Sequence, residues 1–182
     1  MDLLNMTYTI CLDKYPDHYL VKRIERIKPI NFKRHALVLR DVFEKIIDLR
    51  DIPEEIKTYE ICKLAIIQFD GWQLRYVPEF LKDYEICKLA VTSYGNSFRC
   101  VPKRLINYEL CALAVSENGR VFGGIPVELI TPELCRIAVS TSGYALKYIP
   151  DEYVTQELCD VAIKKFHYAD EFVPAKFKIY HN

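Results

Sequence analysis

Cysteine and glutamate recur at a fixed spacing along this chain, and both side chains can do chemistry. A thiolate is a nucleophile and a zinc ligand, and a row of carboxylates could bind an ion or a basic peptide. The recurring cysteines are Cys62, Cys87, Cys111, Cys135 and Cys159, and the recurring glutamates are Glu60, Glu85, Glu109, Glu133 and Glu157. The sequence contains no Cys-x-x-Cys pair and no paired histidines that could converge on one metal ion. We therefore predict that the cysteines pack in a core as small hydrophobic residues and that the chain holds no metal.

Other residue types that often carry catalysis are isolated in this sequence. The histidines lie in no nucleophile or metal motif. They are His18, His35, His167 and His181. Cys100 stands apart from the recurring cysteines and could be an exposed thiol, but no local motif accompanies it. Gly123-Gly124 lacks the lysine and serine of a phosphate loop. We therefore predict a chain that is not an enzyme, with no catalytic residues and no cofactor.

The composition favours a folded protein without a preference for charged polymers. The chain has 182 residues, 51% of them hydrophobic, and 25 basic side chains balance 25 acidic ones. A chain of zero net charge has no overall field that attracts nucleic acid or anionic lipid, so nucleic acid is not favoured as a partner. No secretory signal and no stretch of ~20 apolar residues is present, so we expect a cytoplasmic protein outside the membrane. Reduced cysteines fit the same compartment.

A repeated motif carries the signals of a short helix. A preferred N-cap residue stands four positions before each recurring cysteine, namely Thr58, Asp83, Asn107, Thr131 and Thr155. The glutamate falls in the first turn, where a carboxylate complements the positive end of the helix dipole. A recurring alanine, from Ala65 to Ala162, would let neighbouring helices approach closely. Glycine follows at Gly71, Gly95, Gly119 and Gly143, where we expect it to end the helix.

A returning segment completes each copy of the motif. Proline recurs with a period of 24 residues after one step of 25, at Pro53, Pro78, Pro102, Pro126, Pro150 and Pro174. We expect proline to open a second short turn that ends at Leu81, Leu105 or Leu129, so that each copy forms an antiparallel hairpin. Periods of this length are typical of solenoids, in which each repeat buries its apolar face against the next. The predicted fold is all-α, an alpha-solenoid of about five 24-residue helix-turn-helix repeats.

A leucine-rich repeat is the alternative architecture. The run from Leu110 to Asn118 fits the strand signature of that class, in which 24 residues is a common period. Only this copy has the asparagine, and the cap, proline and glycine positions have no role in a strand. The helical interpretation therefore accounts for more of the pattern.

The two ends of the chain depart from the motif. We expect residues 1–51 to be degenerate helical repeats that act as an N-terminal cap, with amphipathic helices at 17–27 and 31–49. Residues 52–175 carry the tandem repeats, and residues 176–182 form a C-terminal tail. No linker interrupts the chain, so the prediction is one structural domain overall.

Two neighbouring positions of the returning segment suggest how the chain is used. The first holds Arg75, Arg99 and Lys147, and the second holds Tyr76 and Tyr148. Aromatic rings beside basic groups are typical of protein-binding hot spots, and they also suit stacking on single-stranded nucleic acid. The alternative is a purely structural role, in which the rings are half-buried between repeats and the cations are solvated. We predict a protein–protein interaction module or scaffold that binds an unknown protein through these residues, with a nucleic-acid-binding solenoid as the alternative.

The run Leu146-Lys147-Tyr148-Ile149-Pro150, followed by a cap residue and Glu-Leu-Cys-x-x-Ala, resembles short tandem repeats catalogued as a domain of unknown function. Such repeats are abundant in proteins of giant amoeba-infecting viruses. The resemblance covers residues 52–175, with His167 in place of the glycine. It implies a helical repeat fold and transfers no catalytic residues. It also implies a viral origin, with a location in the host cytoplasm or the virion.

Overall fold

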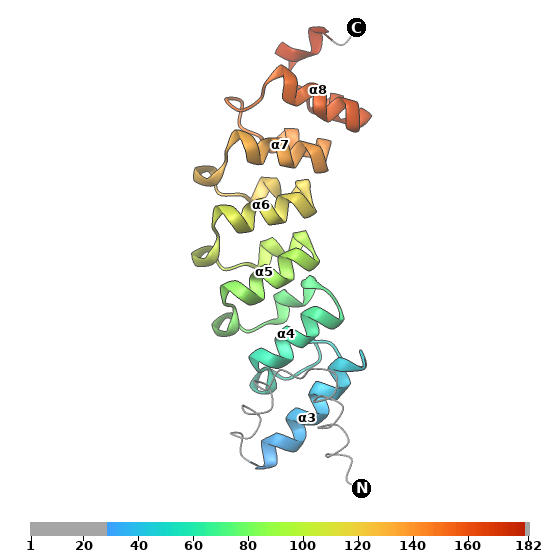
Figure 1. The fold of residues 1–182 in the computed structure, drawn as a ribbon, viewed down its shortest axis with the longest axis vertical. Helices are drawn as coiled ribbons and strands as arrows, with labels where there is room; N and C mark the ends of the chain where they lie inside the picture. Colours follow the sequence, from blue (N-terminus) through green and yellow to red (C-terminus); the bar gives the residue numbers. More distant parts are fainter. Residues whose placement is uncertain (1–28, 181–182) are drawn as a thin grey trace. The chain divides into compact units, whose positions relative to one another are not determined.

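A computed structural model of the chain describes residues 29–180, in which helices are joined by turns and no strand occurs (Figure 1). The chain divides into two compact units, Met1–Leu81 and Lys82–Asn182. With η for a 3-10 helix, the first unit contains α3 (Pro29–Phe43), η1 (Glu54–Ile56), α4 (Tyr59–Gln68), η2 (Gly71–Tyr76) and η3 (Glu79–Leu81). The second unit contains α5 (Tyr84–Ser93), η4 (Gly95–Cys100), η5 (Lys103–Leu105), α6 (Tyr108–Glu117), η6 (Gly119–Gly124), η7 (Val127–Leu129), α7 (Pro132–Thr141), η8 (Gly143–Tyr148), α8 (Gln156–Lys165), η9 (His167–Phe172) and η10 (Ala175–Tyr180).

The α-helices of the repeats begin where the cap residues predict. Each cap side chain accepts a hydrogen bond from the backbone N–H three residues later, over 2.8 Å at Asp83 and 3.4 Å at Thr58. The other three caps, Asn107, Thr131 and Thr155, make the same bond. This bond satisfies one of the N–H groups that a helix leaves unpaired at its start. All five predicted N-caps are confirmed.

The returning segments consist of 3-10 helices. Each recurring proline carbonyl accepts a hydrogen bond from the N–H three residues later, which opens the short turn that the sequence predicts. The turns at η3, η5 and η7 end at Leu81, Leu105 and Leu129. A six-residue 3-10 helix precedes each proline from Pro78 onward, and residues three apart in such a helix lie on the same side. That periodicity decides which side chains share the candidate site.

The repeats of the second unit stack one on the next. Helices α5, α6, α7 and α8 follow one another in Figure 1, and each packs against its successor. The recurring cysteines and alanines of this unit have no exposed surface, so they form the continuous core between the helices. The run from Leu110 to Asn118 forms α6 and its C-cap. The all-α solenoid of short repeats is confirmed, and the leucine-rich alternative is wrong for the residues described.

The recurring glycines do not end the helices in the way the sequence analysis expected. No glycine of the described chain has a positive φ, and the residue before each, such as Asn118 with φ −152°, is extended. A Cβ built on Gly119 would lie 2.4 Å from the carbonyl oxygen of Ala138, in the helix of the next repeat. Gly95 and Gly143 meet the following repeat in the same way. At Gly95, Gly119 and Gly143 glycine is therefore required by close packing between repeats.

The N-terminal part of the described chain differs from the expected helix at 31–49. Helix α3 ends at Phe43, because Lys45 adopts φ 58° and closes a Schellman motif. In this motif the Ile46 N–H bonds to the Asp41 carbonyl over 2.7 Å, and the Lys45 N–H bonds to the Val42 carbonyl over 3.0 Å. The helix expected at 17–27 lies outside the described residues. The domain boundaries expected at residues 51 and 175 stay predictions.

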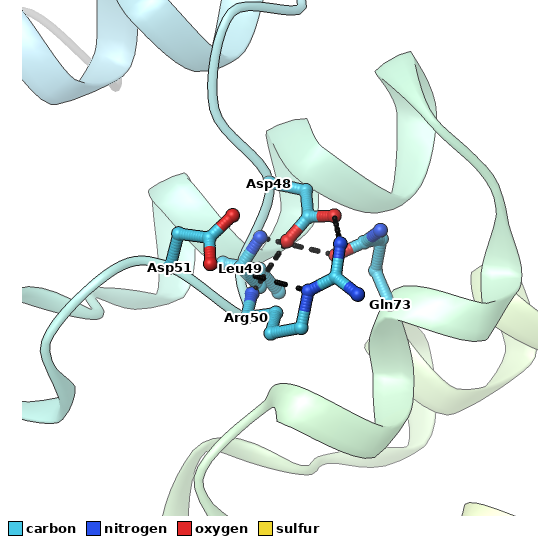
Figure 2. Close-up of polar contacts among 5 residues, drawn as sticks. All are labelled: Asp48, Leu49, Arg50, Asp51 and Gln73. Carbon is cyan, nitrogen blue, oxygen red and sulfur yellow. Dashed lines mark hydrogen bonds and ion pairs between the residues drawn. The ribbon is translucent and has the colours of Figure 1, made fainter.

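A buried amide joins the irregular segment after α3 to the repeat helices of the first unit (Figure 2). The Gln73 side chain is 6% exposed, and its Oε1 accepts a hydrogen bond from the Leu49 N–H over 3.1 Å. Asp48 accepts bonds from the backbone N–H of Arg50 over 2.7 Å and from its guanidinium over 3.2 Å. A buried backbone N–H left without a partner costs ~1–3 kcal/mol, so Gln73 fixes where Leu49 packs.

Candidate functional site

The predicted surface residues lie at the fifth and sixth positions of the six-residue 3-10 helices, and the second position belongs with them. Residues two and five of such a helix share one side, because they are three apart. The second position holds Trp72, Asn96, Arg120, Tyr144 and Tyr168. Sequence analysis missed this set, since it did not expect the returning segment to form a 3-10 helix with a period of three. A period of three counted back from the basic residues, from Arg75 to Trp72 and from Lys147 to Tyr144, would have found it.

In the first unit, the predicted residues Arg75 and Tyr76 lie together with a tryptophan. The guanidinium carbon of Arg75 is 4.7 Å from the ring of Trp72 and 5.3 Å from the ring of Tyr76. Both distances lie within the ~6 Å over which a cation is attracted to an aromatic face. Trp72 is 38% exposed and Arg75 is exposed. The cluster is therefore an accessible cation held over two rings.

In the second unit, two cations share the ring of Tyr144. The ammonium of Lys147 is 5.5 Å from the Tyr144 ring centroid and 5.6 Å from that of Tyr148. The guanidinium carbon of Arg120, one repeat earlier, is 5.3 Å from the Tyr144 ring. The two tyrosine centroids are 5.9 Å apart, and Tyr144 also makes an edge contact with Phe172 at 4.8 Å. The rings and cations of two successive repeats form what we call the cation–tyrosine cluster, defined by Arg120, Tyr144, Lys147 and Tyr148.

Glycine at position 123 makes room for this cluster. A Cβ on Gly123 would lie 2.9 Å from the ring of Tyr148, whereas a Cβ on Gly124 would meet nothing within 4 Å. Gly123 interrupts the basic position that Arg99 and Lys147 occupy, and the ring of the next repeat covers it instead. Arg99 is exposed and has no ring contact or ion pair among residues 29–180. The structure therefore groups Lys147 with Tyr148 and leaves Arg99 separate from them.

The glutamate positions are partly neutralised by neighbouring cations. Glu109 pairs with Lys88 of the preceding repeat over 2.7 Å, and Glu133 pairs with Arg136 of its own helix over 2.6 Å. The ammonium of Lys88 lowers the pKa of Glu109 through this hydrogen bond. All four groups are exposed enough that such pairs add little stability. The first-turn location of the carboxylates matches the predicted electrostatic role.

The recurring cysteines are buried and unpaired by disulfides. Cys62, Cys87, Cys111, Cys135 and Cys159 have no exposed surface and are free thiols. Burial raises the pKa of Cys62 to about 12 and the pKa of Cys111 and Cys135 to about 11. Among residues 29–180, no group of His, Cys, Asp and Glu side chains is arranged to hold a metal ion. A thiol that is buried and protonated at neutral pH is a packing group.

Thiol labelling should separate Cys100 from the recurring cysteines. Cys100 is partly exposed, whereas Cys111 and Cys135 are fully buried. Treating the native protein with N-ethylmaleimide at pH 8 should therefore modify Cys100 at least ~100-fold faster than Cys111 or Cys135, since only thiolates that reach solvent react. Peptide mapping by mass spectrometry measures each site, and labelling in urea provides the unfolded control. Equal native rates at Cys100 and Cys111 would contradict burial of the recurring cysteines.

Comparison with known proteins gives one family likeness. Residues 58–106 match the model of a domain of unknown function, DUF4116. The matched stretch begins at the N-cap of α4 and ends directly after η5, so it spans two consecutive repeats. No curated protein and no solved structure matches the chain. In the part of the chain that the structure describes, no helix is both long enough and apolar enough to cross a membrane.

Proposed function

We propose that the chain is a non-enzymatic interaction module that binds another protein through the six-residue 3-10 helices of its repeats. The observation that supports this proposal is the set of accessible rings with cations against their faces, at Trp72 and Arg75 in one unit and in the cation–tyrosine cluster in the other. Tyrosine, tryptophan and arginine are the residues most enriched in binding hot spots. Tyr148 is 41% exposed, so its ring has apolar area left to bury.

Binding of single-stranded nucleic acid is the second candidate function. The same rings and cations could stack on bases and contact phosphates. Zero net charge counts against this function, because phosphate binding depends on an excess of basic groups. Salt dependence separates the two candidates, since each phosphate contact releases counterions and steepens the loss of affinity with salt.

The proposal extends to the setting in which the chain works. Free thiols throughout the described repeats support a reducing compartment such as the cytoplasm. The resemblance to repeats abundant in giant amoeba-infecting viruses supports a viral origin, with the host cytoplasm or the virion as the location. The burial of the recurring cysteines argues against these thiols as catalytic nucleophiles.

Charge reversal at the three predicted basic residues should weaken partner capture without unfolding the chain. In the variant Arg75→Glu/Arg99→Glu/Lys147→Glu, all three changed side chains are exposed. We expect recovery of a bound protein from native lysate to fall at least ~10-fold, as for hot-spot residues worth more than ~1.4 kcal/mol. Pull-down with quantitative mass spectrometry, with and without nuclease, measures this loss.

A matched variant controls for the change in net charge. Lys63→Glu/Lys103→Glu/Lys164→Glu alters three other exposed lysines by the same total charge. This control should capture the partner as the unmodified chain does, and both variants should melt within a few degrees of it. Equal loss in both variants would argue against a defined face. Recovery that disappears after nuclease treatment would favour the nucleic-acid function.

A further inference from the structure

Two cations in the second unit lie close to one ring. Arg120 and Lys147 lie 5.3 and 5.5 Å from the centroid of Tyr144. Their charged atoms are therefore no more than about 11 Å apart, which is close to the Debye length of ~8–10 Å in physiological salt. Neither side chain forms an ion pair with any residue in the range 29–180. A ring attracts a cation but does not neutralise it, so both charges stay available.

Local contacts position the two segments that carry these cations. The Asn118 side chain accepts a hydrogen bond from the Arg120 N–H over 3.0 Å and also donates one to Asn96 of the preceding repeat over 3.0 Å. Lys147 lies on η8 with its ammonium 5.5 Å from the ring of Tyr144 and 5.6 Å from that of Tyr148, and the Tyr148 ring rests against Gly123. The contacts with the rings restrict where the two cations can lie, which lowers the entropy lost when a ligand binds.

We propose that Arg120 and Lys147, which both lie close to the ring of Tyr144, anchor an acidic segment of a partner protein, one that carries two carboxylates in close succession. This inference rests on the proposed protein-binding function and names the chemistry of the partner. Alternate side chains of an extended segment lie on one side and about 6.6 Å apart, a spacing that two cations no more than about 11 Å apart can match. Each carboxylate would form a charge-assisted hydrogen bond with one cation.

Charge distribution favours a peptide over nucleic acid as the occupant. The cluster presents two cations within a chain that carries 25 acidic and 25 basic groups, so a long polyanion would meet repulsive carboxylates beyond the cluster. A short acidic segment needs only the local pair. The first unit offers a useful contrast, because Arg75 lies over Trp72 and Tyr76 as a single cation. That cluster should bind an acidic pair less well than the cation–tyrosine cluster.

A direct binding experiment with the full chain tests the inference. The probe is a fluorescein-labelled ten-residue peptide in which glutamate alternates with serine, and its matched control has glutamine in place of glutamate. Fluorescence anisotropy should show saturable binding of the glutamate peptide and at least ~10-fold weaker binding of the glutamine peptide, as expected when charge-assisted bonds are lost. Absence of saturable binding of the glutamate peptide would overturn the inference.

Variants locate the binding to the cluster. Arg120→Gln/Lys147→Gln should weaken the glutamate peptide at least ~10-fold, whereas the matched variant Lys103→Gln/Lys164→Gln, which removes the same charge from exposed lysines elsewhere in the unit, should change affinity less than ~2-fold. Equal weakening by both variants, or none by the first, would overturn the anchor. Tighter, cluster-dependent binding of a 20-residue thymidine oligonucleotide would overturn the choice of a peptide. Thermal melts confirm that each variant is folded.

The outcomes distinguish this inference from the function on which it rests. If the glutamate peptide fails to bind but charge reversal at Arg75, Arg99 and Lys147 still abolishes partner capture, only the acidic anchor is wrong. If the peptide binds through Arg120 and Lys147 but capture is unaffected by charge reversal, the cluster binds acidic segments, and Arg75, Arg99 and Lys147 do not hold the native partner.

Discussion

Replacing Phe122 by alanine is expected to lower the free energy of unfolding by about 3–5 kcal/mol. Phe122 is 1% exposed and is among the largest fully buried side chains of the described chain. It belongs to η6, which packs against α6 of its own repeat and against α7 and η8 of the next. Because repeats are held by their neighbours, a cavity here weakens both the hairpin and the interface between repeats. Urea unfolding followed by far-UV circular dichroism measures the loss.

An exposed phenylalanine provides the matched control for this truncation. Phe80 is 79% exposed, so Phe80→Ala should change the free energy of unfolding by less than about 0.5 kcal/mol. Because both variants truncate phenylalanine to alanine, a difference between their free energies of unfolding reports the burial of the side chain. If Phe122→Ala costs no more than Phe80→Ala, the returning segments do not contribute to the core, and the hairpin packing described above is incorrect.

The parts of the fold that sequence analysis predicted are those determined by local chemistry. A cap residue such as Asp83 bonds to an N–H three residues away, and a proline such as Pro102 accepts a bond across one turn, so a single repeat contains the whole signal. Fivefold recurrence then separates that signal from chance. The stacking of repeats followed from the same recurrence, because a short hairpin can bury its apolar face only against another copy.

The parts that it missed depend on contacts between repeats or on unusual backbone. Gly95 and Gly119 look like helix stops in the sequence, and only the distance to the next repeat shows that they are packing residues. No glycine marks the end of α3 in the sequence, because Lys45 takes the left-handed conformation there instead. In the last described repeat, His167 stands in place of the glycine. The His167 side chain is exposed, and residues 168–180 contain no further α-helix against which this position could pack.

The candidate surface was predicted in part for a similar reason. Arg75, Tyr76, Lys147 and Tyr148 are adjacent pairs that stand out in the sequence, and the structure places each cation against the neighbouring ring. Tyr144 and its partner Arg120 come from different repeats, and their contact depends on the 3-10 geometry that places equivalent positions of successive repeats together. No spacing within one repeat reveals such a pair.

Glycine at position 119 should tolerate no side chain, and Gly119→Ala should cost about 3 kcal/mol, the upper end of the range for overpacking. The new Cβ would lie 2.4 Å from the Ala138 carbonyl oxygen and 2.6 Å from Thr141 Oγ1. That carbonyl cannot move aside freely, because it accepts a hydrogen bond from the Ser142 N–H over 2.8 Å. Thermal melting and urea titration measure the change in stability.

Two further glycine variants decide why position 119 requires glycine. Gly124→Ala should be neutral or stabilising by about 0.4–1 kcal/mol, because its Cβ would meet nothing within 4 Å and alanine restricts the unfolded chain. Gly119→Asn separates the two explanations for the recurring glycine, since asparagine tolerates the left-handed conformation of a helix stop but carries the same Cβ as alanine. If close packing is the cause, Gly119→Asn is at least as destabilising as Gly119→Ala. A stable asparagine variant would restore the helix-stop explanation, and it would mean that the repeats are not spaced by contact between Gly119 and the next helix.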